Sequence, residues 1–400
     1  MSQSSRHSPV TLLILMSIAM PIGFSTWSAL LNNFVVERAA FTGVEIGILQ
    51  SLREVPGFLA FTTVFVLLVV KEQTFALLSL VILGIGVALT GLLPFEYGFY
   101  FTTVLMSLGF HYFETVKQSL ALQWLPKNDA PRILGKLIAV GSIASLATYA
   151  LLWILLEIAN LDYVFNLLLS GIACALMALI IWRVFPQFST ETHQRRTLVL
   201  RWRYWLYYVL IFFSGARRQI FVVFAAFLMV EKFHYSAAQV TLLFLINYAF
   251  NWAFAERIGT LIGRFGERRA LTFEYIGLTL VFVGYAFVND STIAAFLYVV
   301  DHMFFALAIA IHTYFQKIAD AKDIASTVGV SFTINHIAAV TVPALLGLVW
   351  IHNPVVVFLI GAGFAICSLI LSQNIPDKPG LENEVIWNIP NIFRRAGPQP

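Results

Sequence analysis

Long apolar stretches recur along the whole chain, and they limit its possible folds more than any other feature of the sequence. The stretch 76–93 reads ALLSLVILGIGVALTGLL and holds no charged residue. A run of about 20 such residues crosses a bilayer as a helix, because a helix satisfies its own backbone hydrogen bonds where water is absent. Charged residues make up only 12% of the chain, against about 25% in soluble domains. The sequence therefore predicts an all-α membrane protein with many spans.

Twelve transmembrane helices fit this pattern. They are predicted over residues 10–36, 44–70, 73–94, 97–125, 133–157, 163–184, 204–230, 237–258, 269–288, 292–316, 326–350 and 353–373. The connections are short, except for one polar and basic segment after the sixth span. We therefore predict a first six-helix bundle within 1–184, a linker over 185–203, a second six-helix bundle within 204–373 and a loosely ordered tail over 374–400.

Lysine and arginine are distributed unevenly between the two ends of the spans. Of the 25 basic residues, four lie within spans, and only Arg38 and Lys232 lie in the loops of one side. All the others lie on the other side, with both termini and the linker. Because basic loops stay in the cytoplasm, we predict cytoplasmic N- and C-termini and a protein integral to the cytoplasmic (inner) membrane.

Two short patterns recur at one offset and point to an internal repeat. The segments TGVEIGIL and SAAQVTLL open the second and eighth spans, 194 residues apart. At the same offset, KNDAP and AKDIA follow the fourth and tenth spans, and Gly135 pairs with Gly329. A shared offset at equivalent points of a six-span pattern indicates a duplicated half.

Other chemistries find no support in the sequence. No P-loop, zinc-ligand spacing or nucleophile elbow is present, so we expect no enzyme activity, no cofactor and no metal. Cys174 and Cys367 both lie in apolar runs and are interpreted as packing residues. The basic loops are explained by topology, so no nucleic-acid partner is expected. The opening segment MSQSSRHSPV leads into an apolar run too long for a signal peptide.

The stretch between the eighth and ninth spans reads GTLIGRFGERRAL. It resembles the signature loop G-x-x-x-D-R-x-G-R-R of the Major Facilitator Superfamily. The matching positions are Gly259, Arg264, Gly266 and Arg268. Gly263 stands where the family has its aspartate, and Glu267 stands where it has an arginine. The equivalent loop of the first half, VLLVVKEQT, lacks the pattern.

The resemblance covers residues 10–373 and implies a fold and a function. It implies two six-helix bundles related by a pseudo-two-fold axis, transport of a small-molecule solute across the lipid bilayer by alternating access, and a monomer. In the family this loop is taken to steady one end state of the transporter, so its four matching residues are candidate gating residues. The resemblance also places spans one, four, seven and ten around a central cavity, and spans three, six, nine and twelve against lipid.

Polar residues within the spans are the candidates for function. A charge at the bilayer centre costs about 2.5–3.5 kcal/mol on insertion scales, so each one needs a reason. They lie in the second, fourth, seventh, eighth, tenth and eleventh spans, whereas the third, sixth and twelfth carry no charge in their interiors. This distribution comes from the residues alone and agrees with the arrangement that the resemblance implies.

The fourth span carries the polar segment HYFETVKQ. At about 100° per residue, its four polar side chains fall within roughly 120° of one helix face; they are His111, Glu114, Lys117 and Gln118. One interpretation is a Glu114–Lys117 pair that only neutralises itself. The other is a stripe facing a cavity, in which His111 and Lys117 contact the solute and Glu114 carries a proton.

Two adjacent arginines stand near the middle of the seventh span. Arg217 and Arg218 cannot share one partner face, and an arginine stays charged while its forked donors match carboxylate or phosphate. One arginine can be balanced by Asp301 or Glu114, which leaves the other free for an anionic solute. The alternative is that both pair with carboxylates of the protein.

The remaining candidates lie in four other spans. In the tenth, Asp301 beside His302 suits proton transfer, because a buried carboxyl and an imidazole both titrate toward neutral pH. In the second, Arg53 and Glu54 precede Pro56, which permits a kink, so we interpret this segment as a gating bend with a charge pair. Further candidate contacts to the solute are Asn247, Asn251 and Asn335.

Three functional hypotheses follow. The favoured one is a secondary active transporter for a small polar, anionic solute, coupled to protons. An efflux pump for amphipathic compounds is favoured by the 36 phenylalanines, but the fifth span lacks the Pro-Gly element that resembles the antiporter motif of drug exporters. A non-transporting sensor or a lipid-modifying enzyme is disfavoured, because the polar groups lie near the midplane and not at the level of lipid head groups.

Overall fold

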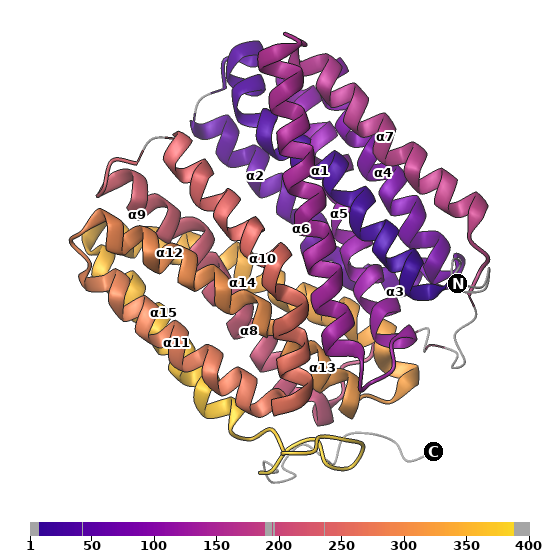
Figure 1. The fold of residues 1–400 in the computed structure, drawn as a ribbon, viewed down its shortest axis with the longest axis vertical. Coiled ribbons are helices and arrows are strands. Elements are labelled where there is room, and N and C mark those ends of the chain that lie inside the picture. Colours follow the sequence, from indigo (N-terminus) through magenta and orange to yellow (C-terminus); the bar gives the residue numbers. More distant parts are fainter. Residues whose placement is uncertain (1–7, 42, 189–193, 195–196, 236, 388–400) are drawn as a thin grey trace.

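The computed structural model describes residues 8–41, 43–188, 194, 197–235 and 237–387. In this part of the chain, long helices run back and forth along one another (Figure 1). The first half contains α1 (Pro9–Ala39), α2 (Gly43–Phe58), α3 (Thr63–Val66), α4 (Glu72–Leu92), α5 (Glu96–Trp124), α6 (Ala130–Trp153) and α7 (Tyr163–Val184). The second half contains α8 (Trp205–Gln219), α9 (Ala226–Glu231), α10 (Ala237–Phe265), α11 (Glu267–Phe287), α12 (Ser291–Phe305), α13 (Ile309–Ile318), α14 (Ile324–His352) and α15 (Pro354–Ser372).

The fifteen helices form twelve spans within the described residues, because three of the spans consist of two helices each. The second joins α2 to α3 through a 3₁₀ turn over Leu59–Thr62, and the tenth joins α12 to α13 through one over Ala306–Ala308. The seventh joins α8 to α9 through a π-helical turn over Ile220–Ala225. The predicted all-α fold is confirmed, and Figure 1 shows the indigo-to-magenta bundle beside the rose-to-yellow bundle.

Judged by length and apolar composition alone, nine helical stretches within the described residues could cross a membrane. The predicted spans that are not among them are 44–70, 97–125 and 237–258. Each of these holds charged or amide side chains in its interior, and each takes part in contacts between the two bundles. Their lower hydropathy therefore reflects interior faces that do not meet lipid.

The bundles meet along two equivalent helix pairs. Where α6 packs on α10, a Cβ added at Gly135 or Gly259 would overlap the backbone of the facing helix. Where α14 packs on the 3₁₀ turn of the second span, Gly329 faces the Ala60 carbonyl oxygen, which would lie 3.3 Å from an added Cβ. Gly135 and Gly329 are the pair predicted from the offset, so the repeat places glycines at matching interfaces.

One contact between the bundles joins residues that are equivalent in the repeat. The Gln316 side-chain amide donates to the backbone carbonyl of Leu122, 194 residues away, at 2.8 Å, and to that of Leu125 at 2.9 Å. A residue that touches its own repeat equivalent lies close to the pseudo-two-fold axis. Of the repeat segments, Thr42 and Ser236 lie outside the described residues.

The signature-like segment is mostly helical, which corrects the predicted end of the eighth span. That span was expected to end at 258, but α10 continues to Phe265 and α11 begins at Glu267. Only Gly266 separates them, with a φ of 86°. Glycine adopts this left-handed backbone conformation without a steric penalty, so the turn between the two helices needs no further residues.

The second span loses its regular helix shortly after Pro56, as its sequence predicts. Proline leaves one carbonyl of the preceding turn without a donor, and the helix gives way to the 3₁₀ turn at Leu59. Thr333 of α14 bonds this irregular backbone from the other bundle. Its hydroxyl donates to the Phe58 carbonyl and accepts from the Phe61 amide, each at 3.0 Å. Irregular backbone at this depth needs such partners.

The described part of the linker is bonded to both bundles. Near its start, the Gln73 side chain of α4 donates to the Pro186 carbonyl at 3.0 Å and accepts from the Phe188 amide at 2.9 Å. Near its end, Arg201 pairs with the buried Asp323 at the start of α14. The hydrogen bond to Asp323 raises the pKa of Arg201 above its usual value.

The tail was expected to be loosely ordered, and its described part is not. The Tyr314 hydroxyl of α13 donates to the Glu384 carbonyl at 2.7 Å, and Arg203 pairs with the Glu384 side chain. Near its end, the Trp387 amide donates to the Asn374 side chain at 2.6 Å. Residues 374–387 therefore cover the end of the second bundle at which the linker lies.

Candidate functional site

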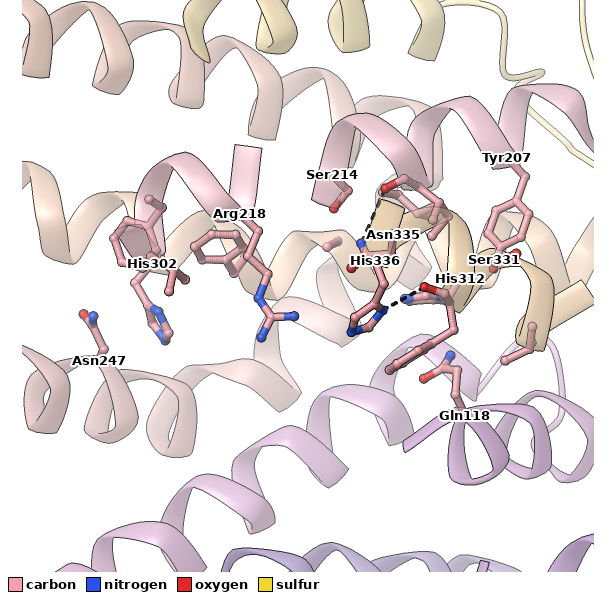
Figure 2. A pocket seen from close by; sticks show the side chains of 18 of the residues that line it. Gln118, Tyr207, Ser214, Arg218, Asn247, His302, His312, Ser331, Asn335 and His336 are labelled. Atoms are coloured by element: carbon pink, nitrogen blue, oxygen red, sulfur yellow. Dashed lines mark hydrogen bonds between the residues drawn. The ribbon is translucent and has the colours of Figure 1, made fainter. Parts of the chain in front are cut away.

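A cavity of about 490 Å³ lies between the bundles, and Figure 2 shows its lining. Its lining residues are Gln118, Tyr207, Ile211, Ser214, Arg218, Phe221, Val222, Phe244, Asn247, Tyr248, Tyr298, His302, Phe305, Ala308, Ile311, His312, Val328, Ser331, Phe332, Asn335 and His336. Gln118 on α5 is the only one of these from the first bundle. The cavity is therefore formed mainly by the seventh, eighth, tenth and eleventh spans.

Arg218 is the single lysine or arginine among the described residues that line the cavity, and no aspartate or glutamate lines it. Figure 2 shows its guanidinium extended into the open space between His302 and His336. Its side chain is exposed. A cation that faces a cavity without a carboxylate makes the cavity electropositive and leaves its forked donors available to a ligand.

Arg217 points the other way and is almost fully buried among the helices of the second bundle. Its Nη2 lies 3.8 Å from Oε1 of Glu274 on α11, and the guanidinium stacks over the Tyr275 ring at 4.5 Å. Its Nη1 donates to the Ser368 hydroxyl of α15. Adjacent helical residues point about 100° apart, so one arginine meets protein partners while the next meets the cavity.

The other polar groups of the cavity are mostly imidazoles and amides. The Asn251 side-chain amide donates to His302 Nε2 at 3.0 Å, which orients the imidazole in the cavity wall. Asn247 is buried, and its Oδ1 has no hydrogen-bond partner among the described residues. Asn335 donates to the Ile211 carbonyl at 3.5 Å. Of the predicted solute contacts, Arg218, Asn247 and Asn335 line the cavity, and Asn251 supports one lining residue.

Aromatic rings make up much of the remaining surface. They are Tyr207, Phe221, Phe244, Tyr248, Tyr298, Phe305 and Phe332. All seven rings offer flat apolar faces, and the three tyrosines add a hydroxyl group at the ring edge. The cavity thus combines one cationic group with broad apolar walls, a composition typical of small-molecule sites.

Asp301 lies beside His302 in sequence but not in the cavity lining. It is fully buried on α12, and neither carboxylate oxygen has a hydrogen-bond partner among the described residues. A buried ionised carboxylate without a partner is costly. An ionised carboxylate at this position would therefore need a partner that the described residues do not supply.

The four polar residues predicted to share one face of α5 make different contacts. Lys117 Nζ lies 2.5 Å from Glu114 Oε1, so these two side chains pair with each other, and neither lines the cavity. Gln118 does line it. His111 is buried and faces α2 and α14, where its ring centroid lies 4.9 Å from that of His336.

The candidate gating residues lie in two places. Arg53 pairs with Glu54 at 2.8 Å on α2, beside a second cavity of about 630 Å³. The signature-like residues lie at the linker end of the bundles, where Arg268 pairs with Asp377 of the tail at 2.5 Å. Glu267, which departs from the family pattern, pairs with Lys317 of α13 at 2.6 Å. Arg264 and Gly266 border a third cavity of about 530 Å³.

The sequence reasoning missed several lining residues and the partner of Arg217. The missed polar lining residues include Tyr207, Ser214, Tyr248, Tyr298 and Ser331. A signal existed for some of them, because 207, 211, 214, 218 and 221 follow the three-to-four spacing of one helix face. Glu274 was not among the candidate residues, and no pattern in the sequence relates it to Arg217.

Comparisons with known proteins agree with this architecture. The sequence matches the family model of the Major Facilitator Superfamily over residues 10–343. No curated protein matches it as a relative. The fold is similar to that of the human organic anion transporter TETRAN, at 12% identity over 93% of this chain and 100% of that chain, with a TM-score of 0.74.

Two sugar transporters are similar to the same degree. The fucose:proton symporter FucP of E. coli, in its outward conformation, matches at 15% identity over 91% of this chain and 98% of that chain, with a TM-score of 0.74. The proton:xylose symporter XylE matches at 11% identity over 96% of this chain and 99% of that chain, with a TM-score of 0.76. At these identities the likeness shows the fold.

Proposed function

The chain belongs to the Major Facilitator Superfamily, and we propose that it is a secondary active transporter for a small organic anion with an apolar body. The observation that carries this proposal is Arg218 in a cavity whose described lining residues include no carboxylate. Guanidinium binds carboxylate or phosphate through two parallel hydrogen bonds. The aromatic walls then contact the rest of the solute.

The transport cycle is proposed to be alternating access, and contacts between the bundles support an arrangement closed at the linker end. Besides Gln316, Lys127 Nζ donates to the Lys317 carbonyl at 3.3 Å, and Arg132 lies 3.4 Å from Glu256. Toward the opposite end, the Trp350 indole donates to Glu231 at 2.9 Å within the second bundle. Such an arrangement presents the cavity to the side away from the linker.

Proton coupling is part of the proposal, and Asp301 is the carrier that its surroundings support best. It is buried, has no hydrogen-bond partner among the residues that the structure describes, and lies next to the cavity residue His302 in the chain. Glu114 stays a second candidate, although its pairing with Lys117 favours a structural role. Among the similar structures, FucP and XylE are described as proton symporters.

An efflux pump for amphipathic compounds is the second candidate function. The aromatic lining favours it, because rings accept apolar solutes of many shapes. The two candidates differ in their need for charge. A pump for neutral or cationic amphiphiles does not need the positive charge of Arg218 to bind its solute, whereas an organic anion transporter depends on it.

A thermal-shift screen of purified protein tests the proposal, since a ligand stabilises the folded state by mass action. Aromatic and aliphatic carboxylates are each compared with the neutral amide of the same skeleton, at two pH values. We expect carboxylates to raise the melting temperature and the amides not to do so. Arg218→Gln should abolish the shift, while Arg257→Gln, which removes an exposed arginine over the Phe254 ring, should preserve it. Equal shifts from acid and amide would favour the efflux alternative.

The proposed orientation places the linker and the tail in the cytoplasm. Single cysteines in 185–203 or in the tail should then be closed to membrane-impermeant thiol reagents in intact cells. A cysteine at the position of Lys232, an exposed residue at the opposite end, should be labelled. Labelling of the linker from outside would reverse the proposed orientation.

A further inference from the structure

Three side chains from three helices bring metal-ligating atoms together at the edge of the cavity that His336 lines. Glu54 lies on α2, His111 on α5 and His336 on α14, and one donor atom of each lies within 4.8 Å of the others. His336 Nε2 is 3.8 Å from Glu54 Oε2. The first two helices belong to the first bundle and α14 belongs to the second, so the cluster spans the interface between the bundles.

Hydrogen bonds fix the tautomer of His111. Its Nδ1 lies 3.0 Å from the Ser107 carbonyl oxygen and 2.8 Å from the Ser107 hydroxyl oxygen. That hydroxyl donates its own proton to the Arg53 carbonyl, so both neighbours of Nδ1 are acceptors. Nδ1 must therefore carry the proton, and Nε2 of the neutral ring keeps a free lone pair.

His336 is held in the same way by its own helix. Its Nδ1 lies 2.8 Å from the Phe332 carbonyl oxygen, and this bond is one of the dashed lines in Figure 2. A carbonyl only accepts, so Nδ1 carries the proton and the lone pair is again on Nε2. The Phe332 ring stacks on the imidazole at 4.7 Å between centroids, which restricts its rotation.

The two oxygens of the Glu54 carboxylate have different surroundings: one accepts hydrogen bonds from Arg53, and the other faces an imidazole. Arg53 Nη2 donates to Oε1 at 2.8 Å, while Oε2 is the atom that faces His336. One nitrogen of each imidazole and one carboxylate oxygen thus lie within 4.8 Å of one another, and each imidazole has its Nδ1 bonded to a backbone carbonyl. This outer bonding is the pattern that orients histidine ligands in metal sites.

We propose that Glu54, His111 and His336 bind one divalent transition-metal ion of the zinc class. Two imidazoles and a carboxylate are a ligand set that zinc takes in proteins, with a fourth position open to water or an anion. Tetrahedral ligands at about 2.0–2.1 Å from the metal lie about 3.3 Å from one another, so side-chain rotations that bring the donors closer by about 1.5 Å complete the site. Mg²⁺ and Ca²⁺ are disfavoured because they prefer oxygen ligands.

A metal at this site would join the two bundles. It needs α14 against α2 and α5, so it binds only those conformations in which these helices are in contact. A ligand stabilises the states that bind it in proportion to its differential affinity. The ion is therefore expected to hold the interface together and to slow any cycle that separates α14 from α2. Metal binding itself does not depend on the identity of the transported solute.

The test uses the purified full-length chain without a polyhistidine tag, and Co²⁺ and Zn²⁺ as the probes. We expect one Co²⁺ per chain with the visible absorption bands of a four-coordinate ion, which Zn²⁺ displaces, and a saturable rise in melting temperature with Zn²⁺ but not with Mg²⁺. His111→Gln, His336→Gln and Glu54→Gln should each weaken binding by more than the roughly 10–100-fold that loss of an outer-shell partner costs.

Two further variants separate ligation from folding. His352→Gln is the matched control, because His352 is an exposed histidine of the same helix whose Nδ1 also lies 3.0 Å from the carbonyl four residues earlier. Glu54→His breaks the Arg53 ion pair, as Glu54→Gln does, but supplies a third imidazole of similar reach. Only a metal site predicts that Glu54→His retains Co²⁺ and shifts its absorption bands while Glu54→Gln loses it.

A third variant keeps every ligand and changes only the space around them. A Cβ added at Gly57 would overlap the His336 ring and lie 2.8 Å from the His111 ring, so Gly57→Ala should displace both imidazoles and weaken binding. Three outcomes would overturn the proposal: no Zn²⁺-dependent stabilisation of the parent, Co²⁺ binding that survives all three glutamine variants, or equal loss in Glu54→Gln and Glu54→His when both still fold.

Discussion

Removing Arg217 should lower the free energy of unfolding far more than removing the neighbouring Arg218. Arg217 and Glu274 are both nearly inaccessible and lie 3.8 Å apart. Removing one partner of such a pair leaves the other charge buried alone, which costs about 3–5 kcal/mol. We expect Arg217→Gln to lower the free energy of unfolding by that order, and Arg217→Gln combined with Glu274→Gln to recover most of it.

The measurement is a double-mutant cycle on thermal or denaturant unfolding of the purified protein. Arg218→Gln is the matched control, since it removes the adjacent arginine, which is exposed to the cavity. It should impair anion binding with little change in stability. If Arg217→Gln proves no more destabilising than Arg218→Gln, the buried pair has no structural role.

Single substitutions can also identify the residue that carries the proton. Asp301→Asn is expected to retain counterflow of solute, because exchange needs the loaded protein to reorient but releases no net proton. It should abolish accumulation driven by a pH gradient in proteoliposomes. Glu114→Gln is measured beside it and should accumulate solute normally, since Glu114 already pairs with Lys117 at 2.5 Å. The reverse result would assign the proton to Glu114.

At the scale of helices, the contact between α6 and α10 depends on two residues without side chains. A Cβ at Gly259 would overlap the Pro131 backbone, which has no flexible end that could move aside. Gly259→Val should therefore push the helices apart, lower the melting temperature and disturb transport. Gly363→Val is the control, because Gly363 lies in α15 and an added Cβ there would meet no described residue outside its own stretch of helix within 4 Å. Equal melting temperatures would mean that the interface tolerates separation.

The helices themselves could be predicted because each signal is local. Apolar length located the spans, Pro56 located the break in the second span, and the offset of the repeat matched Gly135 to Gly329. The end of α10 was placed seven residues early, because the signature-like segment was expected to be a loop. The residues from 259 to 265 continue the helix, and a single left-handed Gly266 turns the chain.

The site could be predicted only in part, because its partners are distant in sequence. Periodicity placed polar residues on interior faces, but it cannot show which helix each face meets. The sequence left Glu114 either paired with Lys117 or facing the cavity, and the structure has the pair, whereas His111 reaches His336, 225 positions along the chain. Arg218 and Arg217 carried the same signal in sequence, and only the packing of α8 against α11 and α15 separates their roles.

The whole molecule should respond to a change at the contact nearest its pseudo-two-fold axis. Gln316 of the second bundle bonds two carbonyls, one at the end of α5 and one just beyond it, at 2.8 and 2.9 Å. Loss of two such bonds is worth about 1–3 kcal/mol, which alters the ratio of two conformations by about 5–150-fold. We expect Gln316→Ala to shift the population toward an opening at the linker end.

The shift can be measured by electron spin–spin distances between labels on the linker ends of α5 and α13, which should lengthen in Gln316→Ala. The matched control is Gln123→Ala, because the Gln123 amide bonds Glu72 and Ser119 within the first bundle, at 2.8 and 2.9 Å. It removes a glutamine near the same end whose hydrogen bonds to described residues all lie within the first bundle. Because opening one end closes the other in alternating access, a second label pair across the opposite ends of α1 and α9 should shorten. Lengthening at both ends would indicate that the bundles separate as a whole, and an unchanged distribution would show that Gln316 does not set the equilibrium.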